Sequence, residues 1–205
     1  MFFDAVDRSV RTYGISHISS SGPIGGLIGL LSQQGDYAAI RDLCEDWIRE
    51  LLAKPEVDQY ERERRSFRLS QLALTLIRLP GPIAFDGELA VRAAEECTVQ
   101  GNDTQYNHWT RLSLVHLRLG HTERAEWAVR ESMRRCKGDC FDSVVQALIH
   151  ARRGELDKAR AWFDRAARET GRNNGPPGHG YKETCDEVAA LLGVNDLPAD
   201  VFAGP

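Results

Sequence analysis

The chain has 205 residues, which is enough for one domain of ordinary size or for a short array of repeats. Its 42% hydrophobic residues, 27% charged residues, 18 Gly and 8 Pro are typical of folded globular proteins, and they exclude collagen-like, low-complexity and wholly disordered chains. Because 30 Asp and Glu outnumber 26 Lys and Arg, no basic excess draws the chain to nucleic acid, and we expect no nucleic-acid partner.

The first segment, residues 1–22, forms an N-terminal extension whose role the sequence does not assign. It begins M-F-F-D-A-V-D, with acids where an export signal places Lys or Arg before an apolar run. The apolar stretch Pro23–Leu31 contains three glycines and is far shorter than the roughly 20 residues that cross a bilayer. Five scattered cysteines make a poor disulfide framework. We therefore expect a cytoplasmic protein with no membrane partner.

The next segments follow a helix, turn, helix pattern. Gly35 lies between two amphipathic runs, and the second run places Ile40, Cys44 and Trp47 on one face. The charged run Lys54–Arg65 is a loop or an extension of the helix that follows it, Ser66–Leu79. Two prolines then enforce a longer turn from Pro80 to Gly87, before a helix that contains Ala90.

The pattern is most regular after residue 108. Gly120 and Gly154, 34 residues apart, each separate two predicted helices, and the first helices are Trp109–Leu119 and Phe141–Ala151. In this frame Ala125 matches Ala159, and Val129 matches Phe163. Small residues at repeated positions let two helix backbones approach closely, so we expect Ala90, Ala125 and Ala159 at helix crossings.

The predicted fold is all-α: a solenoid of about four helix pairs over residues 23–170, closed by a C-terminal capping helix. A Gly- and Pro-rich loop at residues 171–180 ends the last pair, and the capping helix follows at residues 181–193. Residues 194–205 form a loose tail. One helix pair cannot bury both of its apolar stripes, so the pairs must stack on one another.

The segments G-H-T-E-R-A-E-W-A-V and G-E-L-D-K-A-R-A-W-F-D-R-A resemble tetratricopeptide repeats, whose second helix opens G-x-x-x-x-A-x-x-x-F/L-x-x-A. Gly154, Ala159, Phe163 and Ala166 complete that pattern. Residues 35–167 are similar to the divergent repeat tails of large planctomycete-type bacterial proteins, often behind a serine/threonine kinase or a β-propeller. Ser113 departs from the pattern by replacing the first-helix Gly, and Ile40 by replacing Ala.

The resemblance implies a tetratricopeptide-like scaffold that binds a protein or peptide and has no catalytic activity or cofactor. The alternative is a regulatory or sensor segment of a larger bacterial signalling protein, such as a serine/threonine kinase. The chain itself carries no kinase glycine-rich loop, H-R-D or D-F-G.

The candidate partner-binding residues lie at the first helices of the third and fourth repeats. In an α-solenoid these helices line a concave groove, where guanidinium and amide groups can hold an acidic peptide or a carboxylate. The competing interpretation is a solvated helix face, with Arg152 and Arg153 serving the negative end of their helix. The candidates are Asn107, Arg111, Arg118, Arg152 and Arg153.

Other motifs favour structural roles. Cys136 and Cys140 could bind zinc with His108 or His150, but C-x3-C without a second pair is a weak signal, and we expect no metal. His116 and His150 are 34 residues apart, so they occupy equivalent sites and are expected to pack between helices with a satisfied ring nitrogen. The glycine-rich stretches at residues 22–29 and 175–180 lack the sequence of a phosphate-binding loop.

Overall fold

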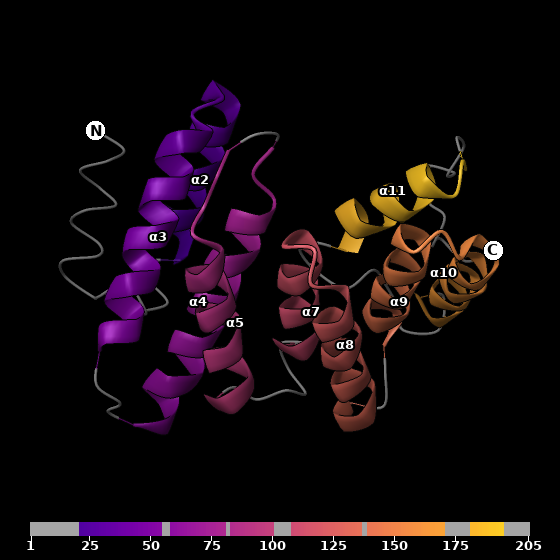
Figure 1. The fold of residues 1–205 in the computed structure, drawn as a ribbon. Helices are drawn as coiled ribbons and strands as arrows, with labels where there is room; N and C mark the ends of the chain where they lie inside the picture. Colours follow the sequence, from indigo (N-terminus) through magenta and orange to yellow (C-terminus); the bar gives the residue numbers. More distant parts are fainter. Residues whose placement is uncertain are drawn as a thin grey trace. The chain divides into compact units, whose positions relative to one another are not determined.

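The computed structural model describes residues 21–54, 58–80, 83–100, 108–136, 139–170 and 181–194. These residues form nine α-helices and no strand (Figure 1). The chain divides into two compact units, Met1–Asn102 and Asp103–Pro205. The predicted all-α class is thus confirmed for the described residues. The predicted loop at 171–180, and all of the predicted extension and tail except Ser21, Gly22 and Val194, lie outside them.

Unit 1 contains four described helices, and α3 packs against the other three. The apolar stripe of α3 includes Ile40, Cys44 and Ile48, and each of these side chains is at most 2% exposed. Asp36 caps this helix, because its carboxylate accepts a hydrogen bond of 3.1 Å from the Ala39 N–H. The helices of unit 1 are α2 (Ser21–Gln34), α3 (Tyr37–Ala53), α4 (Gln59–Ile77) and α5 (Gly87–Gln100).

The helices α4 and α5 form the second pair of unit 1. Ala90, Ala93 and Ala94 of α5 are at most 2% exposed, as expected for a close helix crossing. The α4 helix begins at Gln59, more than a turn before the predicted start, because Asp58 caps it through the Glu61 N–H. The charged run at 54–65 is therefore largely an extension of α4.

Unit 2 contains two helix pairs and a final helix, and α9 is its central element, in contact with the other four (Figure 1). Ala125 and Ala159 are fully buried at the crossings that their spacing predicts. Tyr181 and Val188 of α11 pack inward, while its charged residues are exposed. This helix therefore packs against α9 and presents a polar outer face. The helices are α7 (His108–Arg118), α8 (Thr122–Cys136), α9 (Cys140–Arg152), α10 (Leu156–Thr170) and α11 (Tyr181–Leu191).

One left-handed glycine turn recurs at the end of α2, α7, α9 and α11. The glycine φ angles are 72°, 78°, 75° and 68°, a region that costs a side-chain-bearing residue energy. In each turn the glycine N–H donates to a carbonyl three residues back, and the next N–H donates to one five residues back. The glycines are Gly35, Gly120, Gly154 and Gly193.

Ser113 of α7 links the two helices of its hairpin. Its buried hydroxyl donates a hydrogen bond of 2.7 Å to the carbonyl of Ala125 in α8. The equivalent position in the next repeat, 34 residues later, is Ala147, which is fully buried. The departure from the repeat pattern at Ser113 thus adds a polar link inside one hairpin without changing its packing.

Candidate functional site

The predicted partner-binding residues differ in how much of each is available. Arg118 is exposed in the last turn of α7, and Arg111 is half-buried on the same helix. These two positions are seven residues apart, so they share a helix face about 10 Å apart along the axis. Asn107 lies outside the described residues.

Arg152 of α9 is exposed but has partners on two neighbouring helices of unit 2. Its Nη1 donates a hydrogen bond of 2.6 Å to the carbonyl of Leu117 in α7, and its Nη2 lies 2.5 Å from Oε1 of Glu187 in α11. The guanidinium thus links α9 to both neighbours. Binding an external carboxylate would require it to exchange at least one of these partners.

Arg153 likewise has an intramolecular partner. Its Nη2 lies 2.7 Å from Oε2 of Glu126 in α8, and Arg130 contacts the other oxygen of the same carboxylate. The hydrogen bond from Arg153 lowers the pKa of Glu126, and the charges of Arg130, Arg153 and His150 lower it further. The partners of Arg152 and Arg153 lie 35 and 27 residues away in sequence, so the repeat pattern does not reveal them.

The first helices offer little free surface for a groove. In α9, residues 140–149 and 151 are all buried, and only His150 and Arg152 are more accessible. In α7, only Arg111 and Arg118 are not buried. The accessible residues of the two first helices are thus Arg111 and Arg118 of α7, and His150 and Arg152 of α9.

The two equivalent histidines, His116 and His150, differ in the contacts of their rings. Nδ1 of His150 lies 2.6 Å from Oε2 of Glu155, which agrees with the expected satisfied ring. The buried Nδ1 of His116 has no hydrogen-bond partner among the described residues, and the ring centroid lies 5.8 Å from that of His121. Burial, with the charges of His121 and Arg124, lowers the pKa of His116 to about 4. His116 is therefore neutral near pH 7.

A buried polar cluster that the sequence reasoning missed joins α7, α8 and α9. Oγ1 of Thr110 donates a hydrogen bond of 2.6 Å to Asp142, and it lies 3.0 Å from Oγ of Ser132. Asp142 and Asp139 also form a capping box, whose D-x-x-D spacing was the available signal. Burial raises the pKa of Asp142 to about 6. All three side chains of the cluster are at most 1% exposed, so it serves packing rather than substrate chemistry.

The zinc hypothesis is tested only in part. Cys140 is buried against Thr170, and burial raises the pKa of its thiol. The side chain of Cys136 lies outside the described residues. Among the side chains that the structure describes, no group of three or more His, Cys, Asp or Glu is arranged to hold a metal ion.

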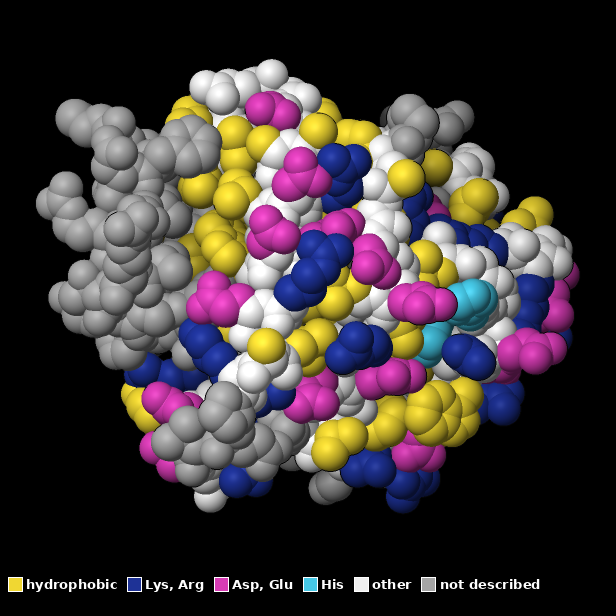
Figure 2. All heavy atoms as spheres, turned by 60° about the vertical axis from the view of Figure 1, so that its left-hand side comes forward, with side chains coloured by type: hydrophobic (Ala, Val, Ile, Leu, Met, Phe, Trp, Pro, Cys, Tyr) yellow, Lys and Arg dark blue, Asp and Glu magenta, His cyan; other side chains and the backbone are white. Residues whose placement is uncertain are grey.

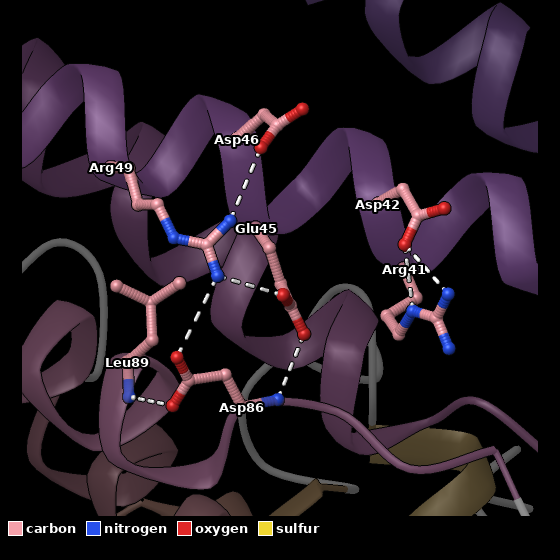
Figure 3. Close-up of polar contacts among 7 residues, drawn as sticks. All are labelled: Arg41, Asp42, Glu45, Asp46, Arg49, Asp86 and Leu89. Carbon is pink, nitrogen blue, oxygen red and sulfur yellow. Dashed lines mark hydrogen bonds and ion pairs between the residues drawn. The ribbon is translucent and has the colours of Figure 1, made fainter.

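The polar residues of α3 in unit 1 also bind one another (Figure 3). Arg49 lies 2.9 Å from Glu45 and 3.6 Å from Asp86, and the other oxygen of Glu45 accepts a hydrogen bond from the Asp86 N–H. Asp86 in turn caps α5 through the Leu89 N–H. Figure 2 shows acidic and basic side chains interleaved on the face that it draws. This network joins α3 to the start of α5 and presents no surface of a single charge.

The outer face of α8 combines an exposed aromatic ring with charged side chains. We define this face by Glu123, Arg124, Trp127, Arg130, Glu131 and Arg134. Trp127 is 53% exposed and is the only exposed Trp, Tyr or Phe among the described residues of unit 2. Its ring meets the buried Trp109 edge to face, with centroids 5.3 Å apart. The signal was available, because Trp127 falls outside the buried stripe of Ala125, Ala128, Val129 and Ser132.

Comparison with known proteins gives no relative. No protein-family model, curated protein or solved structure matches the chain. Within the described residues, no helix has the length and apolar character needed to cross a membrane.

Proposed function

We propose that this chain is a tetratricopeptide-like α-solenoid that binds a protein or peptide partner and performs no catalysis. The observation that carries this proposal is the recurrence of one hairpin in unit 2. Gly120 and Gly154 make the same turn, and Ala125 and Ala159 are both fully buried five residues later. Stacked hairpins of this kind generate an extended surface, which helical-repeat proteins use to hold other chains.

The residues that carry the repeat resemblance support the same proposal. Phe163 and Ala166 continue the stripe that starts at Ala159, and all three are buried where α10 packs against α9. The pattern is thus matched by burial as well as by sequence. Since α9 is enclosed on most of its surface, the partner would bind outside the central helix.

The partner chemistry follows from the accessible cations. Arg118 is exposed, and Arg111 is half-buried on the same face of α7, so an acidic segment is the class of ligand that this face would hold. Arg152 and Arg153 would contribute only after exchanging Glu187 and Glu126 for ligand carboxylates.

The test is capture of partners by the full chain, followed by cross-linking and mass spectrometry. We expect at least one protein to be retained in a constant ratio and to be displaced by excess free chain. The variant Arg118→Glu, alone and with Arg111→Glu, should lower retention by about tenfold, while Arg168→Glu on exposed α10 surface should not. Circular dichroism checks helicity. No retained protein would contradict the function, and unchanged retention in both variants would move the site away from α7.

A further inference from the structure

We infer that the outer face of α8 docks an acidic segment of another protein, with an apolar side chain of that segment seated on Trp127. This inference rests on the proposed function and names a second surface for it. An indole with half of its surface in water is a common anchor at protein interfaces, because it buries a large area with few rotatable bonds.

The position of Trp127 is fixed before any partner binds. Its ring packs edge-on against Trp109, which is only 8% exposed. The guanidinium of Arg135 also lies over the Trp109 ring, 4.8 Å from its centroid. A ring held on one side by the core loses little conformational freedom on binding, so the cost of docking is low.

The charges around Trp127 favour an acidic occupant. Arg134 lies two helical turns from Trp127 on the same face, with Arg130 beside them. The Arg130 and Arg134 side chains are 70% and 65% exposed, whereas Glu126 and Glu131, the acids that they contact, are only 18% and 22% exposed. The cations are thus presented to solvent while these two acids are withdrawn.

The withdrawn acids remain charged but are shared between arginines. Hydrogen bonds from Arg134 and Arg135 lower the pKa of Glu131, and hydrogen bonding to Arg153 lowers that of Glu126. Arg130 and Arg134 pair with acids three or four residues away on α8 itself, and such exposed pairs exchange partners at little cost. Glu123, in the first turn, is the one exposed acid on this face.

Two other occupants fit this face less well. A second copy of the chain meeting it across a two-fold axis would gather Arg130 and Arg134 of both copies in one interface, where like charges repel. A single-stranded nucleic acid could stack one base on Trp127, but strand-binding surfaces stack successive bases on several aromatic side chains, and Trp127 is the only exposed one among the described residues of unit 2.

The experiment uses the full chain and three short fluorescein-labelled peptides of equal length. One alternates Glu and Asp with Leu and Phe, the second keeps the acids but replaces the apolar residues by Ser and Gly, and the third is basic. Fluorescence polarisation is read at low and high salt. We expect the first peptide to bind at least about tenfold more tightly than the second, and the basic peptide not to bind.

The variants separate the apolar anchor from the cations. Trp127→Ala should remove the preference for the first peptide over the second. The double change Arg130→Gln and Arg134→Gln should weaken both acidic peptides and flatten the salt dependence. The matched controls are Leu156→Ala, which trims another exposed apolar residue, and Arg168→Gln, which removes another exposed arginine; both should bind as the parent does.

Four outcomes would overturn the inference. They are absence of binding by the first peptide, equal affinity in the Trp127→Ala variant, tighter binding of a single-stranded oligonucleotide through the same residues, and a sedimentation-detected dimer that Trp127→Ala dissociates. If captured partners depend on Arg118 but not on Trp127, the proposed function stands and this docking site falls.

Discussion

In both units polar side chains join neighbouring helices, but the kind of contact differs. In unit 1, partly exposed ion pairs join the helices: Arg49 reaches Asp86, and Arg65 lies 2.9 Å from Glu96. In unit 2, a buried cluster around Asp142 joins α7, α8 and α9. Unit 2 also has ion pairs between helices, from Arg152 to Glu187 and from Arg153 to Glu126. Both units should therefore respond to salt, whereas the buried His108, His116 and Asp142 should make unit 2 the more sensitive to pH.

The largest expected effect is acid destabilisation of unit 2. Burial, with the charge of Arg111, lowers the pKa of His108 to about 4, and His116 has a similarly lowered value. Both histidines bind protons more readily when unfolded, so their contribution to stability is lost as the pH falls from 6.5 towards 4. Asp142, with its pKa raised to about 6, opposes this, because the folded state takes up its proton first.

The net prediction is a loss of about 3 kcal/mol in the free energy of unfolding between pH 7 and about pH 4.5, measured by urea denaturation. His116→Gln removes one titrating group and should reduce that loss to about 0.5 kcal/mol. Equal pH dependence in the parent and the variant would show that burial of His116 does not govern acid stability.

The next effect concerns the glycine turn, which unit 2 uses at Gly120, Gly154 and Gly193. Gly154→Val should cost about 2 kcal/mol, because a β-branched residue resists a φ of 75°. The matched control is Gly29→Ala in the interior of α2, where the added Cβ meets nothing within 4 Å. That change should stabilise by about 0.5 kcal/mol. Thermal unfolding measures both, and an unchanged midpoint for Gly154→Val would contradict the repeat frame.

A smaller effect distinguishes the two hairpins of unit 2. Ser113→Ala removes the hydrogen bond to the Ala125 carbonyl and should cost about 1 kcal/mol. The variant would then have Ala at this position in both hairpins, because the second hairpin already has Ala147 there. Chemical denaturation measures the loss. A gain in stability would show that Ala is the better residue at both positions.

The smallest effect is expected in unit 1. Arg49→Gln breaks contacts to Glu45, Asp46 and Asp86. Because the Arg49 side chain is half exposed, this change should shift the unfolding midpoint less than Ser113→Ala does. The shift should disappear in high salt, because screening already weakens these pairs. A shift that persists in high salt would mean that the network acts through packing.

The helices and turns of this fold were accessible from the sequence, whereas its side-chain partners were not. Gly120 and Gly154, together with the apolar period, predicted two hairpins to within a residue or two, because backbone turn geometry is a local property. The links from Arg152 to Glu187 and from Arg153 to Glu126 depend on helix crossings, which local periodicity does not specify. The intramolecular roles of Arg152 and Arg153 were accordingly not predictable from the repeat pattern.

The recurring glycine turn separates how this chain folds from what its surface offers. Backbone bonds at Gly120 and Gly154 turn the chain in the same way in both hairpins, although the outward residues of α8 and α10 differ. The same register position holds an indole at Trp127 and a methyl group at Ala161. Substitutions on the outer face of either helix can therefore change which ligands the helix binds, while the hairpin that supports it stays the same.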